Sequence, residues 1–501
     1  MTVAPASITI LGGGTAGWMA ACLLQQAWGE RTTVRLIESS QIGIVGVGEG
    51  STPQMKAFFD RLGVSEAEWM PRCNATYKVG IEFEGWSSRP GHERYFHPFP
   101  TALDGHSAPQ FFRAARQKRH GVDVEAHPDA FLLPGLMARR KLAPISPEHF
   151  PFEVSYGYHF DAHLVGQYLK ELATGWGVEW LDTKVASVEI EAGRVAALVG
   201  EDGARHAADF FIDASGFRAM IIEQALGGEH LSFADNLWAD SAVVLPSGVA
   251  DGGPECATRA IAMSAGWRWS IPLTNRTGNG YVYASSYLGA EEAEAELRAA
   301  LGLGDEVEAR HLKMRCGRMT DSWASNCLAI GLAQGFLEPL EATALHIVLA
   351  TVEGFIATVD REGISDDARS GFNQDIGARY EGIRDYIVAH YRCQLRRDTQ
   401  YWRDCAQNDA LSPSLKGVIT SWFTKQDLQA EIQNQQIARY YNAVSWHCLL
   451  AGYGNFPPEA QLSAPGEEMG VADMARIHAF LEGCAMNFPS HSDALALLKD
   501  G

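Results

Sequence analysis

The sequence predicts an α/β fold that ends in a mainly helical module, and three observations support this prediction. Within residues 7–38, β-rich apolar runs flank a helical segment. In the middle of the chain, short runs of apolar or alternating residues are joined by brief links, a pattern typical of antiparallel strands. From about residue 368 the pattern becomes mostly helical. We therefore expect two modules, residues 1–367 and 368–501, the first assembled from discontinuous segments.

The N-terminal segment has the order strand, glycine turn, helix, strand. Gly12, Gly14 and Gly17 have the spacing GxGxxG, which allows a tight turn and lets the backbone approach a pyrophosphate at a helix N-terminus. Glu38 ends the second strand, where an acid can accept hydrogen bonds from a ribose. GxGxxG alone is weak evidence, but strand, helix and acid are all in place. We expect a dinucleotide to contact Gly12, Gly14, Thr15, Ala16, Gly17 and Glu38.

Two distant segments favour FAD over NAD. Residues 210–216 read as a buried strand that enters a turn at Asp213, and residues 326–331 repeat this pattern. Both resemble the segments that return to FAD in glutathione-reductase-like flavoproteins, so Asp213, Gly331 and Leu332 are candidate cofactor contacts. Each segment alone could be an ordinary buried strand. Together they predict a Rossmann-type sheet plus an antiparallel, substrate-side sheet.

Short strands are expected at residues 178–181, 185–190 and 195–199, paired antiparallel because the links between them are short. Residues 43–50 hold so many glycines that we expect an ordered loop rather than regular structure. Free backbone amides there could run alongside a flat ring, so we interpret Val47 and Gly48 as part of a strap against the flavin rather than a plain surface loop.

Composition limits the function classes. The formal net charge of −20 argues against a nucleic-acid partner, which requires a basic field. The nine cysteines are scattered without a CxxC pair, so we expect no metal site and no disulfide framework. No apolar stretch reaches about 18 residues, so we expect no membrane contact. A cytoplasmic location is the simplest interpretation.

Five motifs, in this order, resemble the flavin-dependent tryptophan-halogenase family. They are GGGTAGW at residues 12–18, GVGEGSTP at 46–53, YKVG around Lys78, WRWSIP at 267–272 and GFLEPLE at 335–341. The matches extend from about residue 8 to residue 454. The resemblance implies a halogenase that uses FAD as FADH2 from a separate flavin reductase, together with O2 and bromide or chloride. Hypohalous acid would form at the flavin and travel through a tunnel to a lysine beside an aromatic substrate.

The resemblance assigns roles to individual residues. Lys78 matches the lysine, which as an ammonium could polarise hypohalous acid or as a neutral amine could form a haloamine. Glu341 matches a glutamate that could raise the electrophilicity of the halogen or take a proton from the substrate. It also reads as a carboxylate at a helix start, and the amides of Thr343 and Ala344 could then hold halide. Here Ala342 and Ala344 replace the serine and glycine that many members carry, which leaves the fine geometry of the halide site open.

Aromatic residues complete the predicted site. Trp267 and Trp269 lie on one face of an expected strand and would form a barrier between flavin and substrate, although an isolated WxW also reads as core. His97, Phe99 and Trp446 match rings that enclose indole, or are packing residues. Tryptophan-specific members carry an acid between the tyrosine pair and this tryptophan, whereas residues 442–445 hold none. We therefore expect indole, or an indole-like arene, rather than free tryptophan.

Two other functions are compatible with these motifs. A flavin-dependent aromatic hydroxylase would share the FAD elements but would not need Lys78 or the tryptophan barrier. A catalytically silent flavin-binding protein would bind FAD without turnover.

Overall fold

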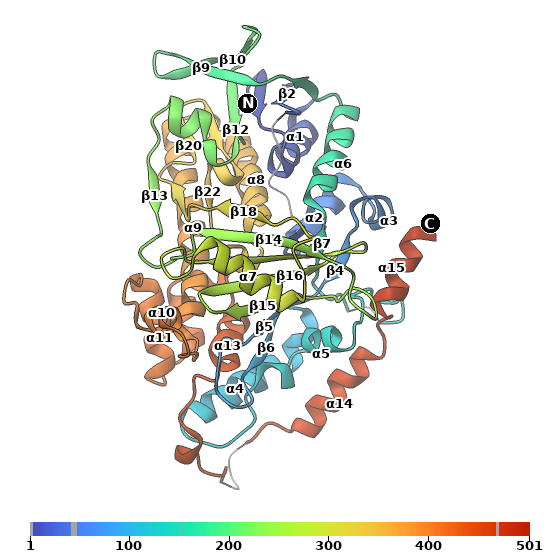
Figure 1. Cartoon of the computed structure of the whole chain (residues 1–501), viewed down its shortest axis with the longest axis vertical. Helices are drawn as coiled ribbons and strands as arrows, with labels where there is room; N and C mark the ends of the chain where they lie inside the picture. The colour runs from blue at the N-terminus through green and yellow to red at the C-terminus, as the bar shows by residue number, and fades with distance from the viewer. Residues whose placement is uncertain (1–3, 42–47, 151, 467–469, 501) are drawn as a thin grey trace. The chain divides into compact units, whose positions relative to one another are not determined.

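The computed structural model describes residues 4–41, 48–150, 152–466 and 470–500 (Figure 1). The chain forms two compact units. The first comprises residues 1–74, 160–235 and 314–381, and the second comprises residues 75–159, 236–313 and 382–501. The predicted boundary at residues 367 and 368 falls inside helix α9 (Asp366–Cys393), and the units divide elsewhere because the chain passes between them several times.

The first unit contains a six-stranded sheet in the order β20-β21-β12-β1-β2-β8, and two small antiparallel sheets, β11-β10-β9 and β13-β19-β22. Its strands are β1 (Ser7–Leu11), β2 (Thr33–Glu38), β3 (Glu49–Gly50), β8 (Glu179–Asp182), β9 (Val185–Glu191), β10 (Arg194–Gly200), β11 (Arg205–Ala207), β12 (Phe210–Asp213), β13 (His230–Ser232), β19 (Gly317–Met319), β20 (Trp323–Ala324), β21 (Cys327–Ala329) and β22 (Gly335–Phe336). Its helices are α1 (Thr15–Trp28), α2 (Gln54–Leu62), α3 (Glu66–Trp69), α6 (Ala162–Gly175), α8 (Ala344–Glu362) and the first part of α9.

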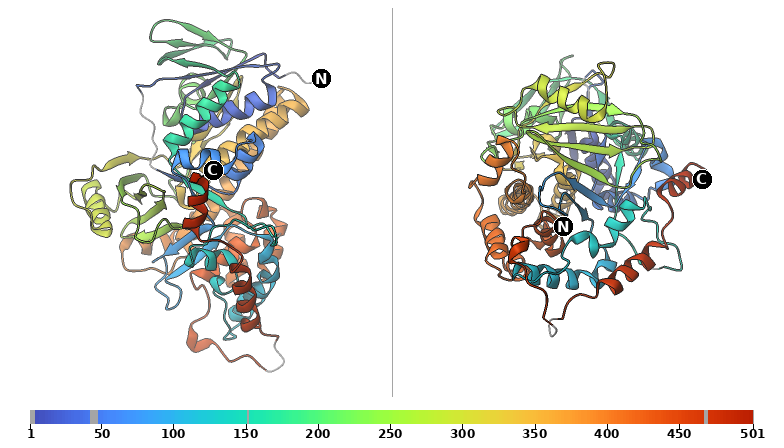
Figure 2. Two further views of the ribbon diagram at one scale, coloured as in Figure 1. Left: turned by 90° about the vertical axis from the view of Figure 1, so that its right-hand side faces the viewer. Right: turned by 60° about the horizontal axis from the view of Figure 1, so that its bottom comes forward.

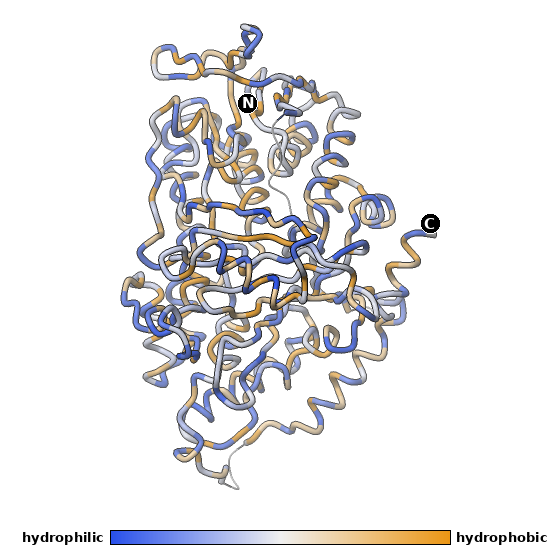
Figure 3. The backbone as a smooth tube through the Cα atoms, in the orientation of Figure 1, coloured by the Kyte–Doolittle hydropathy of each residue, from blue (hydrophilic) through white to orange (hydrophobic). Residues whose placement is uncertain are grey.

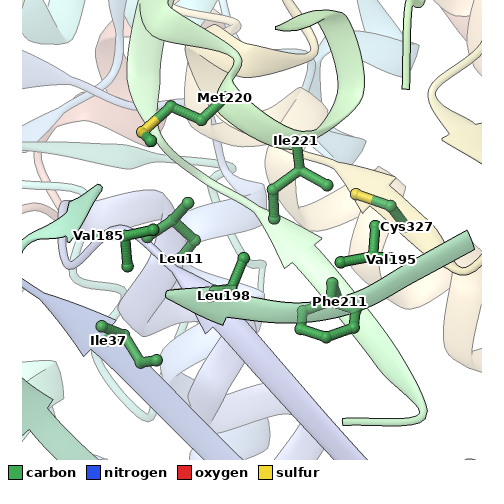
Figure 4. Packing of buried hydrophobic residues seen from close by; sticks show 9 residues of the cluster. All are labelled: Leu11, Ile37, Val185, Val195, Leu198, Phe211, Met220, Ile221 and Cys327. Atoms are coloured by element: carbon green, nitrogen blue, oxygen red, sulfur yellow. The ribbon is translucent and has the colours of Figure 1, made fainter. Parts of the chain in front are cut away.

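The predicted strand–turn–helix–strand unit is confirmed. β1 is the central strand and pairs in parallel with β2 on one side and β12 on the other. The apolar residues of these strands face a cluster formed with the β9–β10 ribbon and the π-helix Met220–Ala225 (Figure 4). Burial on both faces explains why parallel strands read as continuous apolar runs. The β9–β10 ribbon itself extends beyond the parallel sheet (Figures 1 and 2).

The expected antiparallel pairing is correct for β9 and β10 but wrong for the strand before them. β8 pairs in parallel with β2, from Arg35 opposite Glu179 to Glu38 opposite Asp182. The short link from β8 to β9 leads to a different sheet, so link length alone did not identify the partner.

The second unit contains a seven-stranded sheet in the order β18-β14-β17-β16-β15-β5-β6, in which only β5 and β15 pair in parallel. Its strands are β4 (Thr76–Lys78), β5 (Gly80–Glu84), β6 (Arg94–Pro98), most of β7 (Gly157–Phe160), β14 (Ser241–Ser247), β15 (Thr258–Met263), β16 (Gly266–Pro272), β17 (Thr277–Tyr283) and β18 (Arg310–Lys313). Its helices are α4 (Ala108–Arg119), α5 (Leu133–Arg139), α7 (Ala290–Leu301), the second part of α9, α10 (Gln400–Gln407), α11 (Pro413–Phe423), α12 (Leu428–Asn434), α13 (Ala443–Gly452), α14 (Met474–Ala485) and α15 (His491–Asp500).

The predicted α/β class and the mainly helical C-terminal part are confirmed. From α9 to α15 the chain is helical with irregular links, and α14 alternates between apolar and polar residues along its length (Figure 3). Such alternation is typical of a helix that buries one face. Among the described residues, every helix is too short or too polar to cross a lipid bilayer.

Candidate active site

The glycine loop between β1 and α1 is shaped by close backbone packing. Gly12 has φ +115°, and a Cβ on it would overlap the carbonyl oxygen of Ala214. A Cβ on Gly17 would overlap the carbonyl oxygen of Gly12 in the same way. A Cβ on Gly14, in contrast, would meet no protein atom within 4 Å. Two glycines therefore serve the protein's own packing, while the third leaves open space beside the loop.

The open space lies at the N-terminus of α1. Gly14 is the N-cap residue, no side chain caps the helix, and no acidic residue stands in its first turn. The first amides of a helix attract anions, and here no side chain of the described residues competes for them. The donor set and the space beside Gly14 fit the pyrophosphate of a dinucleotide.

Glu38 lies against this loop. A Cβ on Gly13 would overlap the Glu38 carboxylate, so the two residues approach closely only because residue 13 is glycine. One carboxylate oxygen, Oε1, accepts hydrogen bonds from Lys170 Nζ and Trp180 Nε1, each at 2.9 Å. These partners hold the carboxylate at the end of β2, where sequence analysis expects a ribose contact.

The carboxylate of Asp213 is held by hydrogen bonds within its own turn. The residue is fully buried, and both carboxylate oxygens are already engaged: Oδ1 by the amide and hydroxyl of Ser215, Oδ2 by the amides of Ile221 and Ile222. Burial raises the pKa of this carboxyl group. Its side chain therefore shapes the turn after β12, the segment that the sequence predicts to approach the cofactor.

The remaining predicted cofactor contacts lie nearby or outside the described part of the chain. Gly331 follows β21 in a left-handed conformation, φ +59°, and a Cβ on it would stand 3.0 Å from the Cβ of Ala16 in α1. Gly331 and Leu332 are half-buried. Gly48 has φ +87° and precedes β3. Val47 lies outside the described residues.

Lys78 ends strand β4 and is fully buried. β4 pairs antiparallel with β7, with Lys78 opposite Gly157. The next residue, Val79, donates its amide to the carbonyl of Cys256 at 2.8 Å and accepts from the amide of Phe99 at 3.2 Å. The lysine is therefore held on a strand that is hydrogen-bonded on both sides, away from bulk solvent.

The surroundings of Lys78 combine an aromatic ring with a neutral imidazole. Its ammonium nitrogen stands 5.4 Å from the centroid of the Phe99 ring. His159 is fully buried, and its pKa is held well below the usual value by burial first and then by the positive charge of Lys78. A desolvated ammonium over an aromatic face is suited to interact with a small polar molecule.

Trp267 and Trp269 lie on β16 as predicted, and alternation along the strand places them on one face. Their exposed fractions are 1% and 7%, and their ring centroids are 6.2 Å apart. A Cβ on Gly280 of the neighbouring strand β17 would overlap the Trp269 ring. Gly280, which sequence analysis did not single out, thus makes room for the second tryptophan.

Glu341 is buried and ends the 3₁₀ turn Pro339–Glu341. The helix therefore begins later than expected. α8 starts at Ala344, and the side chain of its N-cap residue Thr343 makes no capping hydrogen bond. Between turn and helix, Ala342 has φ +54°, ψ +37°, and Thr343 has φ −91°, ψ −5°. A left-handed residue followed by a right-handed one turns successive amides toward the same point, an arrangement that binds anions.

Aromatic rings surround the predicted substrate residues. His97 is buried on β6, Phe99 is half-buried just after it, and Trp446 is buried on α13. Tyr386 of α9, which sequence analysis missed, stacks on Tyr441 with ring centroids 3.6 Å apart, and its ring also contacts His97 and Trp446. Only tertiary packing reveals Tyr386, because its local sequence reads as an ordinary helix.

The predicted residues fall into two groups. Lys78, the tryptophan pair and the three predicted substrate rings belong to the second unit. The glycine loop and Glu341 to Ala344 belong to the first.

Comparison with known proteins decides the identity of the chain. The sequence profile of the family described as tryptophan halogenase matches residues 7–465. The chain belongs to the tryptophan halogenase family. It is 34% identical to the 7-chloro-L-tryptophan 6-halogenase KtzR of Kutzneria sp. (strain 744), over 98% of this chain and 99% of that protein. It is 35% identical to the tryptophan 6-halogenase SttH of Streptomyces toxytricini, over 90% of each.

A solved structure agrees with these sequence relatives. BrvH, a flavin-dependent halogenase from Brevundimonas sp. BAL3, superimposes with a TM-score of 0.84 at 31% identity, covering 99% of each chain. The chain is therefore a flavin-dependent halogenase, an oxidoreductase that uses a flavin, O2 and halide. The glycine loop and the uncapped start of α1 are consistent with the flavin.

Proposed function

We propose that this halogenase uses FADH2 from a separate flavin reductase to brominate or chlorinate an indole or an indole-like arene, with Lys78 as the residue that presents the oxidised halogen. The relatives show the family but leave this substrate and this role open. The observation that carries the proposal is the fully buried amino group of Lys78 beside the Phe99 ring.

The first unit would bind cofactor and halide. The amides at the start of α1 would hold the pyrophosphate, and Glu38 would hold the ribose of FAD. Bound reduced flavin supplies the two electrons that, with O2 and a proton, convert halide to hypohalous acid and water. The amides around Thr343 and Ala344 would hold the halide, because the side chain of the N-cap residue Thr343 makes no capping hydrogen bond to α8.

The second unit would direct the oxidised halogen. A Lys78 ammonium donates a hydrogen bond to the oxygen of hypohalous acid and so polarises the oxygen–halogen bond. The arene attacks the halogen, the oxygen leaves as water, and the ring loses a proton. A neutral Lys78 would instead carry the halogen as a haloamine. Burial serves both routes because it keeps water from competing for the oxidant.

Glu341 and the tryptophan pair complete the proposal. The Glu341 carboxylate would accept the proton that the ring loses, or strengthen the electrophile. The rigid, buried rings of Trp267 and Trp269 would keep the arene from the flavin while a small oxidant passes.

The substrate assignment rests on charges near the aromatic residues. Asn442 uses its side-chain oxygen to cap α13, accepting from the amides of Val444 and Ser445. Asp385, beside Tyr386, is engaged by Arg384 and by the hydroxyl of Ser412. Because both side chains are already engaged, free tryptophan would lose a charge-assisted contact of about 1.5–3 kcal/mol that either one could otherwise make to its ammonium group.

The test supplies the protein with flavin reductase, NADH, FAD, O2 and bromide, and compares indole with free tryptophan. We expect bromoindole, with kcat/KM at least about tenfold above that for tryptophan. Lys78→Met should abolish bromination while FAD binding, followed by fluorescence, is retained. Equal or better turnover of tryptophan contradicts the substrate assignment. Hydroxylated product formed without bromide indicates a monooxygenase, and FAD binding without turnover on either arene contradicts the proposal.

A further inference from the structure

Strand β4, which carries Lys78, is contacted by two buried histidines from distant parts of the sequence. His159 lies opposite Thr76 on β7, and His491 begins α15. The exposed fraction of both imidazoles is 0%. Since a buried polar ring must satisfy its nitrogens, the hydrogen bonds of each histidine reveal its protonation state.

The tautomer of His159 follows from its partner Thr76. The Thr76 hydroxyl donates its single proton to the carbonyl of Pro272 at 2.7 Å, so it can only accept from His159 Nδ1, 3.1 Å away. His159 therefore carries its proton on Nδ1. Its Nε2, 2.9 Å from the hydroxyl of Thr258, then accepts. This chain of hydrogen bonds connects β15, β7, β4 and β16, the strand of the tryptophan pair.

His491 also carries its proton on Nδ1, but it contacts β4 through its other nitrogen. Its Nε2 accepts the backbone amide of Tyr77, the residue before Lys78, at 3.2 Å. Its Nδ1 donates to the carbonyl of Pro254 at 2.9 Å. The contact with β4 is thus made through Nδ1 in His159 and through Nε2 in His491.

Both imidazoles are neutral. Burial, and next the positive charge of Lys78, hold the pKa of His159 well below its usual value. Burial lowers the pKa of His491 to about 4. A protonated His491 would place a donor against the Tyr77 amide, and a protonated His159 would place a second positive charge near Lys78.

We propose that His159 and His491 are positioning residues that hold β4, and with it Lys78, in the geometry that halogen transfer requires. This inference rests on the proposed role of Lys78. The C-terminal helix α15 would then contribute to catalysis through one nitrogen atom, without touching substrate or cofactor.

The experiment exploits the length of two amide side chains. The asparagine amide occupies the position of Nδ1, and the glutamine amide, one bond longer, reaches the position of Nε2. His159→Asn keeps the contact with Thr76 and His159→Gln loses it. At the other position, His491→Gln keeps the contact with Tyr77 and His491→Asn loses it. Each variant retains one of two hydrogen bonds, so a purely structural role predicts similar losses for both substitutions at a position.

We expect a crossed pattern in kcat for bromination of indole. His159→Asn and His491→Gln should stay within about threefold of the parent, whereas His159→Gln and His491→Asn should fall at least about 30-fold, because a misplacement of about 1 Å can cost 100-fold. KM for indole should be unchanged. His478→Asn and His478→Gln, at an exposed site on α14, are matched controls.

The outcomes separate the two proposals. Suppose that Lys78→Met is inactive, but that the Asn and Gln variants have equal kcat at each position, or that the same substitution has the higher kcat at both positions. The positioning role is then wrong and the proposed function stands. If Lys78→Met still brominates, the role of Lys78 fails and the positioning role with it. If circular dichroism shows that a histidine variant does not fold, Thr76→Val and Thr258→Val repeat the test. Thr76→Val should lower kcat at least about 30-fold, whereas Thr258→Val should keep kcat within threefold of the parent. Equal effects of these two overturn the inference.

Discussion

The strand that carries Lys78 and the turn that carries Glu341 hold their acid–base groups in opposite ways. β4 is extended and hydrogen-bonded on both sides, and its Thr76 and Tyr77 are contacted by buried neutral histidines. The Glu341 turn is short, passes through a left-handed alanine and enters a helix with no side-chain cap. The strand immobilises a cation by packing. The turn leaves backbone amides available for an anion.

The difference has a physical cause. A buried ammonium is costly unless its surroundings are arranged in advance, so its strand needs many partners. A halide site needs converging amides, which a strand cannot supply because its amides point alternately to opposite sides.

Replacement of the turn's carboxylate should have the largest effect. We expect Glu341→Gln to lower kcat for bromination about 100-fold, because a positioned acid–base group contributes about 10²–10⁴ to rate. FAD binding should be unchanged. Glu353→Gln, at a half-buried residue of α8 that pairs with Arg61, is the matched control. If Glu341→Gln retains the parent kcat, the turn serves only halide binding or structure.

Low pH should destabilise the fold because His491, which contacts β4, is neutral in the folded chain. His491 has a folded pKa of about 4, lowered by burial and by the charge of Lys141, against about 6.5 when unfolded. Between about pH 6.5 and pH 4, His491 is protonated in the unfolded chain but neutral in the folded chain. The stability contributed by the neutral ring is therefore fully present above pH 6.5 and is lost as the pH falls toward 4.

The measurement is urea unfolding of the parent and of His491→Gln between pH 7 and pH 4.5. We expect the free energy of unfolding of the parent to fall about 2 kcal/mol more than that of the variant. His92, His346 and His447, whose pKa values burial also lowers to about 4, titrate in both proteins and cancel in the difference. Parallel curves would show that His491 is not neutral in the fold.

The smallest effect concerns backbone strain in the turn. Ala342 has φ +54°, where a side chain costs about 1 kcal/mol. Ala342→Gly should therefore raise the free energy of unfolding by about 0.5–1 kcal/mol, measured by urea denaturation, and leave kcat within twofold. Ala344→Gly, at the first position of α8, is the control and should destabilise slightly. A destabilised Ala342→Gly variant would mean that the turn is not strained.

Local patterns in the sequence were sufficient for much of the fold. The order of β1, α1 and β2, the antiparallel β9–β10 pair, the strand with Trp267 and Trp269, and the helical C-terminal part were all predicted. Each depends on periodicity or glycine spacing within a few tens of residues. β8 was assigned the wrong partner and α8 begins later than expected, because partner choice and helix ends depend on distant residues.

Motif spacing and periodicity were enough to assign the class of this protein: the α/β fold, the dinucleotide loop and the motifs that identify a flavin-dependent halogenase. How side chains within each unit are held depends on contacts that form only in the folded chain. Asp213 is engaged by its own turn, Tyr386 stacks on Tyr441, and His159 and His491, far apart in the sequence, both contact β4. A motif records neighbours along the chain, whereas hydrogen bonds and desolvation depend on neighbours in space.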